Sequence, residues 1–250
     1  MVYLGSKAQI ADWLIPILNN VIEKYEITNY YEPFVGGANV IDKVKCEHKV
    51  GNDKNKPLIA LLEVARDNFD MIPKNGDKEW FDRARAIYTG KSDEKMDDYL
   101  IGAIGWLAGY SGKGLVGSYA NDSGTRHYYT ERYNNLKAQA PNLQGIEFTC
   151  AEYQTLEIPD GSLVYCDPPY EGTTGYGYAW ERSFDYNVYW NWVREKSKNC
   201  YVICSEEAFP NDFTIIAMQN KKRTVAQTNR QTKVEKLGVY NEGLLKNLKI

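Results

Sequence analysis

The chain has 250 residues, of which 43% are apolar and 25% are charged, and its formal net charge is −3. This composition supports one globular core, or a core with a modest inserted domain, and excludes collagen-like, linker-like and polybasic chains. No apolar run approaches the roughly 20 residues that span a bilayer. The start of the chain contains Asp12 and lacks a basic segment, so no signal peptide is expected. We therefore expect a cytoplasmic protein without a membrane segment.

The cysteines and histidines indicate neither a disulfide framework nor a metal site. The five cysteines form an odd set without a CxxC pair, and His48 and His127 lie far apart in the sequence. Cys150, Cys166 and Cys204 end apolar strand-like runs, where a reduced cysteine behaves as a small core side chain. We therefore expect structural thiols and no bound metal.

The first half of a nucleotide-binding α/β unit is predicted near the N-terminus. Apolar residues recur at helical spacing over 10–22, with Ser6 as the N-cap and Pro16 as a kink or interruption. A short strand at 29–32 then enters a glycine turn. A helix through residues 40–44 follows, and a second strand ends at an acid, Asp53. This order is typical of a mononucleotide-binding unit.

The middle of the chain has a different pattern. Helices are predicted from residue 58, over 80–88 and over 93–107, with Asp93 as a cap. Residues 109–133 are rich in Gly, Ser, Tyr and basic residues, which indicates a hairpin or loop. Later strands are expected at 146–150, 162–166, 201–204, 213–218 and 234–240, with a helix at 188–197. The sequence thus predicts a discontinuous sheet with a mostly helical insertion between its second and third strands.

The tetrapeptide Asp167-Pro168-Pro169-Tyr170 directly follows an apolar strand. In open α/β sheets, reactive groups lie at the carboxyl ends of strands. The Asp167 carboxylate and the Pro168 carbonyl could accept the two hydrogens of a nucleobase exocyclic amine and draw its lone pair out of conjugation. The proline rings keep that carbonyl aimed, and the Tyr170 ring offers a stacking surface for an extruded base. Asp167, Pro168 and Tyr170 are therefore the candidate catalytic residues.

Four separated motifs together resemble the DNA adenine-N6 methyltransferases of the Dam-like D12 class, of the alpha type, and most closely their phage and prophage members. The motifs are residues 3–7, 32–37, 52–53 and 167–170. The resemblance implies an α/β fold with a Rossmann-like methyltransferase sheet, mixed, of seven strands, with an antiparallel last hairpin. It also implies a catalytic domain of residues 1–56 and 145–250. Residues 57–144 would form an inserted, mostly helical target-recognition domain, with a hairpin or loop at about 110–133.

The same resemblance implies S-adenosyl-L-methionine as the cofactor. Its expected contacts are Tyr3, Lys7, Phe34, Gly36, Gly37, Asp53, Glu152, Tyr153 and Asp167. The glycines lack a Cβ, so their backbone can approach a ligand closely, and Asp53 can accept the ribose hydroxyls. Lys7 would meet the cofactor carboxylate. Glu152 departs from the family, which often has Asp at this position.

Double-stranded DNA is the expected partner, and an acidic chain must concentrate positive charge locally to meet phosphates. The candidate DNA-binding residues are Lys113, Arg126, Tyr128, Arg132 and Ser205. Arg126 is the candidate base reader because an arginine fork suits guanine, and Tyr128 and Tyr129 add stacking surface. Ser205 and Glu206 resemble a motif that borders the target-base pocket. A second basic stretch lies at 221–236.

The sequence therefore predicts a site-specific DNA methyltransferase that acts on N6 of a flipped-out adenine. Three alternatives stay open. Cytosine N4 presents the same kind of amine. A nicotinamide dehydrogenase would need GxGxxG, whereas the turn reads Phe-Val-Gly-Gly-Ala-Asn. A catalytically inactive DNA-binding relative would keep the fold without the reaction. No obligate protein partner is evident, and a cognate restriction endonuclease is the partner that the resemblance implies.

Overall fold

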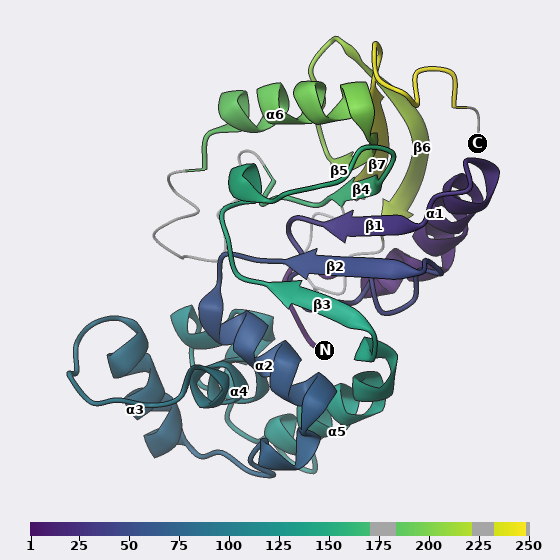
Figure 1. Cartoon of the computed structure of the whole chain (residues 1–250). Coiled ribbons are helices and arrows are strands. Elements are labelled where there is room, and N and C mark those ends of the chain that lie inside the picture. Colours follow the sequence, from purple (N-terminus) through teal and green to yellow (C-terminus); the bar gives the residue numbers. More distant parts are fainter. Residues whose placement is uncertain (171–183, 222–232, 249–250) are drawn as a thin grey trace.

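The computed structural model describes residues 1–170, 184–221 and 233–248 (Figure 1). The strands are β1 (Asn29–Glu32), β2 (His48–Asn52), β3 (Ile146–Thr149), β4 (Leu163–Cys166), β5 (Tyr201–Glu206), β6 (Phe213–Lys221) and β7 (Lys233–Tyr240). The α-helices are α1 (Ala11–Lys24), α2 (Lys56–Asp67), α3 (Lys78–Tyr88), α4 (Asp98–Ala108), α5 (Tyr128–Gln139) and α6 (Tyr186–Asn199). Among these described helices, none has the length and apolar character needed to cross a bilayer.

The strands form one mixed sheet in the order β3-β2-β1-β4-β5-β7-β6. Strands β1 to β5 are parallel, whereas β7 runs antiparallel to both β5 and β6. The predicted α/β sheet of seven strands with an antiparallel last hairpin is confirmed for the described residues. From β1 the chain moves outward to β2 and β3, and it then returns to place β4 on the other side of β1. The carboxyl ends of β1 and β4 therefore meet at the switch point where open α/β sheets bind ligands.

Helices cover both faces of the sheet because the side chains of each strand alternate between the faces. Leu163 and Tyr165 of β4 belong to a buried cluster with α1, while Val164 and Cys166 belong to a second cluster with α6. All four side chains are buried. A strand that is covered on both faces reads as an unbroken apolar run, which made β4 easy to predict from the sequence.

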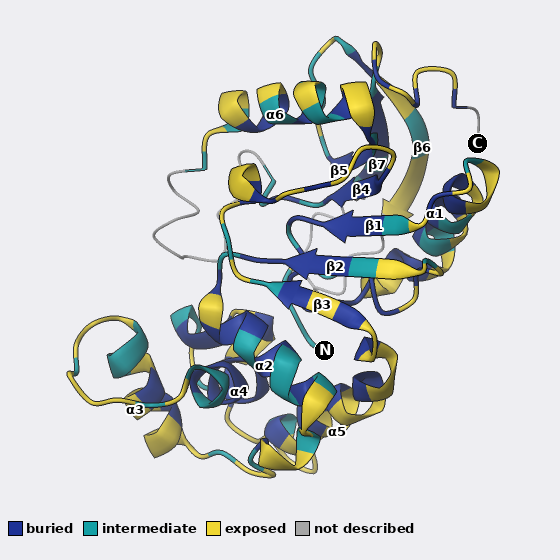
Figure 2. Cartoon of the chain, in the orientation of Figure 1, coloured by how far each residue is buried: buried dark blue, intermediate teal, exposed yellow. Residues whose placement is uncertain are grey.

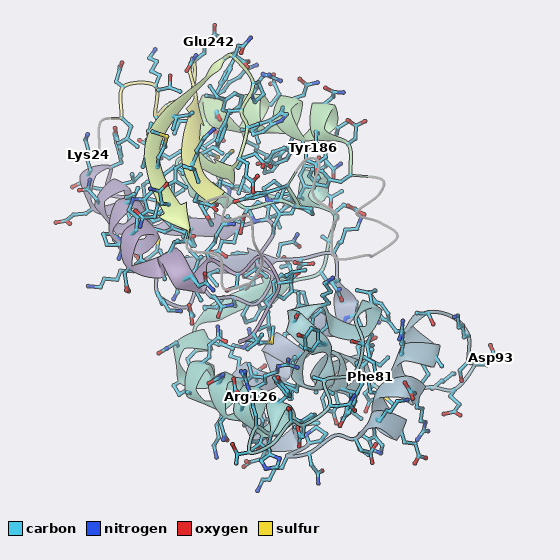
Figure 3. All side chains as sticks on the ribbon, turned by 180° about the vertical axis from the view of Figure 1, so that it is seen from behind. Lys24, Phe81, Asp93, Arg126, Tyr186 and Glu242 are labelled. Carbon is cyan, nitrogen blue, oxygen red and sulfur yellow. The ribbon has the colours of Figure 1, made fainter. Side chains whose placement is uncertain are left out.

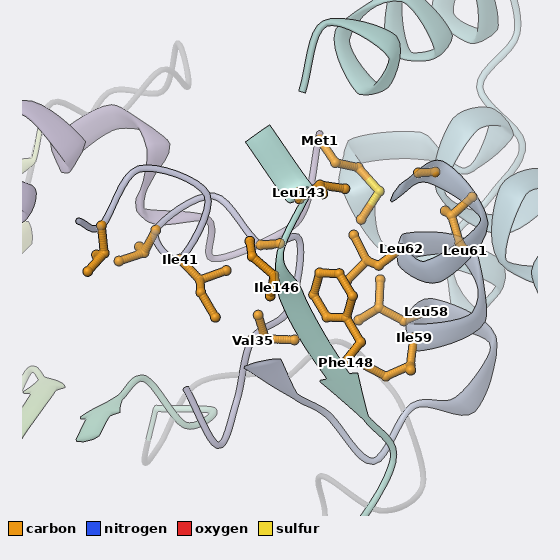
Figure 4. Close-up of a cluster of buried hydrophobic side chains, with 14 of the residues drawn as sticks. Met1, Val35, Ile41, Leu58, Ile59, Leu61, Leu62, Leu143, Ile146 and Phe148 are labelled. Atoms are coloured by element: carbon orange, nitrogen blue, oxygen red, sulfur yellow. The ribbon is translucent and has the colours of Figure 1, made fainter. Parts of the chain in front are cut away.

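Helices α2 to α5 lie between β2 and β3 in the sequence and pack beside the edge strand β3 (Figure 1). Ile146 and Phe148 of β3 share an apolar layer with Leu58, Ile59 and Leu62 of α2 (Figure 4). The same buried cluster continues into α4, most of which is buried among the other helices (Figure 2). The helical segment and the sheet therefore share one hydrophobic core.

The predicted helix through residues 40–44 is wrong, because residues 33–47 form a series of turns. The Gln139 amide donates to the carbonyls of Gly37 and Ala38, at 3.1 and 3.0 Å, and the Lys43 ammonium donates to the carbonyl of Asn39 at 3.0 Å. An α-helix would need these carbonyls for its own N–H groups. Side-chain donors, Gln139 from outside the segment and Lys43 from within it, thus occupy carbonyls that a helix would use.

The boundaries of two other helices also differ from the prediction. Helix α4 begins at Asp98 rather than near residue 93, because the apolar face starts only at Ile101. Helix α5 begins at Tyr128, inside the segment predicted as a loop. Tyr129, Tyr133 and Leu136 bury one face of α5 at helical spacing. The tyrosines at these positions carry a helix signal that the polar composition of the segment obscured.

Two single residues differ from the expectations. Pro16 does not interrupt α1, because a proline removes one backbone hydrogen bond while Leu14, Ile17 and Leu18 anchor the helix in the core, and the kink expected there stays a prediction. Cys150 is exposed rather than buried, because β3 ends one residue before it. Ser6 does act as a cap: its Oγ accepts a hydrogen bond from the Ala8 N–H at 3.1 Å.

The crossing of α2 and α4 depends on Gly102. A Cβ at this position would lie 2.1 Å from the carbonyl oxygen of Pro57 on α2. We expect Gly102→Ala to lower the free energy of unfolding by about 2 kcal/mol, although alanine favours a helix, because the two helices must move apart. Urea denaturation checks this. Lys137→Ala, on the exposed side of α5, should change stability by less than about 0.5 kcal/mol. Equal effects of the two substitutions would contradict the packing argument.

Candidate active site

A cleft of about 810 Å³, part of it open to solvent, lies at the carboxyl ends of β1 to β4. In Figure 1 the arrowheads of β1, β2 and β3 point toward this edge of the sheet. All nine residues predicted to contact a cofactor line the cleft: Tyr3, Lys7, Phe34, Gly36, Gly37, Asp53, Glu152, Tyr153 and Asp167. The fold thus brings together four loops and the N-terminal segment, which are separate in the sequence.

The glycine turn after β1 forms one wall of the cleft as bare backbone. Gly36 has a φ of 49°, in the left-handed region that favours glycine. The ring of Tyr3 lies directly on this turn. A Cβ would come within 2.9 Å of that ring at Gly36, and within 2.7 Å of the Asn39 side chain at Gly37. The missing Cβ atoms therefore make room for Tyr3 and Asn39, and both glycines also line the cleft.

Asp53 lies directly after β2, and its carboxylate is fixed by the backbone. It accepts hydrogen bonds from the N–H of Gly36 at 3.2 Å and of Asn55 at 3.0 Å. Burial raises the pKa of Asp53 to about 6, although both backbone bonds favour the charged form. A buried acceptor with this pKa, facing a cleft, fits a ligand that brings hydroxyl donors.

Aromatic side chains form another wall of the cleft. The ring centroid of Phe34 lies 5.1 Å from that of Tyr153 and 5.9 Å from that of Phe184. Tyr153 is buried, whereas Glu152 is exposed and forms an ion pair with Lys54 at 2.9 Å. Of the Glu152-Tyr153 pair, Tyr153 therefore supplies the apolar surface that suits a flat ring. Phe184 was missed because no motif surrounds it.

Lys7 is the buried centre of a charged network. It opens the short 3-10 helix η1 (Lys7–Ile10), and its side chain is 3% exposed. Its ammonium lies 2.6 Å from Asp167 Oδ1 and 3.2 Å from Glu235 Oε1, and it donates to the Tyr170 hydroxyl at 2.8 Å. Burial lowers the pKa of Lys7, but the two carboxylates outweigh it and raise that pKa overall. The predicted partner of Lys7 was a cofactor carboxylate, whereas the structure places it between two protein carboxylates.

The Asp167–Tyr170 segment leaves the end of β4 and enters this network. The Asp167 side chain is 21% exposed and lines the cleft, while Pro168 is buried. The carbonyl of Pro169 accepts a hydrogen bond from the Tyr186 hydroxyl at 2.8 Å, which ties the segment to α6. The prolines and this bond hold Asp167 at the mouth of the cleft.

Tyr170 connects the same segment to β5 and β7. Its hydroxyl lies 3.1 Å from Ser205 Oγ and donates to Glu235 Oε1, which also accepts from the Ser205 hydroxyl. Glu235 is 2% exposed. The sequence associated Ser205 with the target base, and the structure places it beside Tyr170. Glu235 was missed because it lies in a basic stretch, where a single acid has no motif value.

Two further buried carboxyl groups surround Asp167. Glu32, at the end of β1, accepts a hydrogen bond from the Tyr30 hydroxyl at 2.7 Å, and burial raises its pKa well above the usual value. Burial also raises the pKa of Glu206, on β5, to about 8. Glu206 Oε2 is buried and has no hydrogen-bond partner among the described residues. This part of the site is therefore rich in carboxyl groups whose burial favours the neutral form.

The candidate DNA-binding residues of the helical part fall into two groups. Lys113 and Arg126 are exposed, and Arg126 lies on the helical part of the molecule, away from the sheet (Figure 3). Arg126 forms a two-bond ion pair with Glu131, at 2.8 and 2.9 Å, and its guanidinium lies 4.6 Å from the ring centroid of Tyr128. Arg126, Tyr128 and Glu131 are thus in mutual contact, with Arg126 and Glu131 exposed and Tyr128 half-buried.

Arg132 and Tyr129 are buried instead, although the Arg132 guanidinium also lies 5.5 Å from the ring centroid of Tyr128. Arg132 is buried, and its Nη1 donates to the carbonyls of Leu107 and Gly109 at 3.1 and 2.7 Å. The hydroxyl of buried Tyr129 donates to the carbonyl of Pro73 at 2.8 Å. Both side chains therefore hold the helical part together, and the contacts with DNA expected of Arg132 and Tyr129 stay predictions. Of the second basic stretch, residues 222–232 lie outside the described residues.

Comparison with known proteins agrees with this geometry. The family model of D12 class N6 adenine-specific DNA methyltransferases matches residues 3–189. The chain is 24% identical over 198 residues to the type II methyltransferase M.MjaIII of Methanocaldococcus jannaschii, covering 68% of each protein. It is 23% identical over a 278-residue alignment to the type II methyltransferase M1.LlaDCHI of Lactococcus lactis subsp. cremoris, covering 96% of this chain and 94% of that one. Since the family model covers most of the chain, the protein belongs to the D12 class of N6 adenine-specific DNA methyltransferases, which use S-adenosylmethionine as methyl donor.

Proposed function

We propose that the cleft beside Asp167 holds S-adenosylmethionine and that Asp167, Pro168 and Tyr170 present the N6 amine of a flipped-out DNA adenine to it. The observation that carries this proposal is the position of Asp167: its carboxylate lines a glycine-walled cleft at the switch point between β1 and β4. A nucleotide-like ligand and a reactive carboxylate are expected together at such an edge.

The residues of the cleft fit the cofactor part by part. The bare backbone of Gly36 and Gly37 suits the methionine moiety, Asp53 suits the two ribose hydroxyls, and the rings of Phe34 and Tyr153 suit the adenine. When bound, S-adenosylmethionine supplies an electrophilic methyl group on a sulfonium. The protein contributes orientation and electrostatics rather than a covalent intermediate.

Asp167 and Pro168 act on the target amine. The carboxylate of Asp167 and the carbonyl of Pro168 accept the two N–H hydrogens, which makes the nitrogen lone pair available. The ion pair with Lys7 keeps Asp167 charged, and the two prolines keep the carbonyl aimed. The ring of Tyr170 offers the base a stacking surface, and its hydroxyl bonds fix that ring in place.

The catalytic assignment predicts the behaviour of Asp167→Asn. This substitution keeps the shape of the side chain but removes its charge, so methyl transfer should fall at least about 1,000-fold while the protein stays folded. Transfer of labelled methyl groups to mixed-sequence duplex DNA, followed by nucleoside analysis, measures this loss. Asp160→Asn, at an exposed position, serves as the control. Near-normal turnover of Asp167→Asn would overturn the assignment, and N4-methylcytosine in the product would overturn the choice of base.

The ribose assignment predicts a pH dependence of cofactor binding. With a pKa of about 6, Asp53 is mostly protonated at pH 5 and ionised at pH 7, and only the ionised form accepts strongly from both hydroxyls. Affinity for S-adenosylmethionine should therefore rise about ten-fold between pH 5 and pH 7, a range in which the cofactor's amino group stays charged. Calorimetry measures it. Asp53→Asn should bind more weakly at pH 7 and lose the pH dependence, whereas a wild-type affinity that is the same at both pH values would remove Asp53 from the ribose site.

We also propose that residues 57–144 recognise DNA through the surface of Lys113, Arg126 and Tyr128. The support is the exposure of Lys113 and Arg126 and the position of the Arg126 guanidinium over the half-buried Tyr128 ring. Glu131 and the Tyr128 ring already hold the Arg126 guanidinium in place, so a base or phosphate that replaces Glu131 as its partner would bind a pre-ordered donor. Arg132 has no part in this proposal.

The DNA proposal predicts that Arg126→Ala weakens duplex binding about ten-fold or more and relaxes the recognised sequence. Fluorescence anisotropy and sequencing of methylated adenines measure the two effects. Arg83→Ala is a matched control, because Arg83 also forms an exposed ion pair, with Glu94 on the helical part. If both variants lose the same affinity, the effect is general electrostatics and the Arg126 surface is not the reader.

The cellular setting is also a proposal. We propose a cytoplasmic enzyme of a bacterial or phage-infected cell, with a cognate restriction endonuclease as its functional partner. The support is that both relatives named above are type II methyltransferases.

A further inference from the structure

Glu235 is buried in the active site although it lies on β7, far in sequence from the catalytic segment. Its Oε1 accepts hydrogen bonds from the hydroxyls of Tyr170 and Ser205 and lies 3.2 Å from the Lys7 ammonium. The family model ends at residue 189, so it says nothing of this residue. Glu235 thus contacts Lys7, Tyr170 and Ser205, but it does not itself line the cleft.

The charge of Lys7 creates a difficulty that Glu235 can remove. Lys7 lies 2.6 Å from Asp167 Oδ1, and at this distance, away from water, an ammonium strongly offsets the field of the carboxylate. During methyl transfer the amine nitrogen forms a bond to the methyl carbon as the methyl–sulfur bond breaks and its electron pair stays on sulfur. The nitrogen is then cationic until its proton passes to water. Asp167 stabilises that charge only to the extent that Lys7 does not neutralise it. A second carboxylate on the far side of Lys7 reduces this neutralisation.

Burial supports this division of roles between the two carboxylates. The Asp167 side chain is 21% exposed and lines the cleft, whereas Glu235 is 2% exposed. Leaving a buried lysine without enough negative charge is costly, so both acids keep Lys7 charged and in place. Glu235 also orients the Tyr170 hydroxyl, which accepts from Lys7 while donating to Glu235.

We propose that Glu235 is a positioning residue for methyl transfer: it holds Lys7 and Tyr170 in place and offsets the charge of Lys7, so that Asp167 remains effective toward the target amine. This inference rests on the proposed role of Asp167. Glu235 touches neither substrate nor cofactor, and its effect passes through Lys7 and Tyr170.

The test is a double-mutant cycle on Lys7 and Glu235. Glu235→Gln keeps the shape and the hydroxyl contacts but removes the charge, so kcat should fall about 10- to 100-fold while the Kd for S-adenosylmethionine changes less than about two-fold. In a Lys7→Met background the same substitution should cost little, because no positive charge is left to offset. The double variant should therefore turn over within about two-fold of Lys7→Met alone.

Several controls separate this role from a merely structural one. Glu195→Gln, on the exposed side of α6 where Glu195 pairs with Lys198, should leave kcat, cofactor affinity and unfolding unchanged. Glu235→Asp retains the charge and should recover part of the lost kcat. If Glu235→Gln does not fold, comparison of Lys7→Met with the double variant still decides, since Glu235→Gln should not lower kcat further in that background.

Three results have distinct meanings. Normal kcat of Glu235→Gln would overturn the proposal, and so would a double variant that is about 10-fold or more slower than Lys7→Met alone. A wild-type protein that binds the cofactor but forms no N6-methyladenine would instead contradict the proposed function. Loss of cofactor affinity together with kcat in Glu235→Gln would show that the residue only supports the fold.

Discussion

One buried ammonium between two carboxylates connects the parts of this active site. Lys7 comes from the N-terminal segment, Asp167 from the end of β4 and Glu235 from β7, and all three meet beside the cleft. A lysine that is 3% exposed is stable only with such partners, so the three segments must assemble together. The site is therefore a property of the whole sheet rather than of the catalytic tetrapeptide.

The strand order explains why a ligand cleft lies next to this network. β4 lies on the side of β1 opposite β2, so the connections after β1 and β4 run in opposite directions. They leave space where the two strands end. The ring of Tyr3 packs on the glycine turn after β1, which leaves no room for a Cβ there. Asp53, at the end of β2, accepts a hydrogen bond from the same turn. Acidic groups and one cation then lie on the β4 side of the same space. The surfaces proposed for the cofactor and for the target amine thus lie at neighbouring strand ends.

The helical part is joined to the sheet through packing and not through a flexible linker. Phe148 on the edge strand and Leu62 on α2 belong to one apolar cluster. The Gln139 side chain of α5 also donates hydrogen bonds to backbone carbonyls of the glycine turn after β1. Arg132 satisfies carbonyls at the end of α4. The proposed DNA-reading surface on these helices is therefore held at a fixed position relative to the cleft, as the proposed base flipping requires.

The sequence by itself determined the local features: the seven strands, the glycine turn, the acid after β2 and the reactive tetrapeptide after a doubly buried strand. These follow from patterns within a few residues, because side-chain alternation, missing Cβ atoms and proline rings act locally. Only the tertiary structure decided which charged side chains became internal partners. Lys7 forms ion pairs with Asp167 and Glu235, and Arg132 donates hydrogen bonds to backbone carbonyls. In both cases the partners of the buried charge come from strands and helices that are distant in the sequence. A linear pattern does not contain those distances.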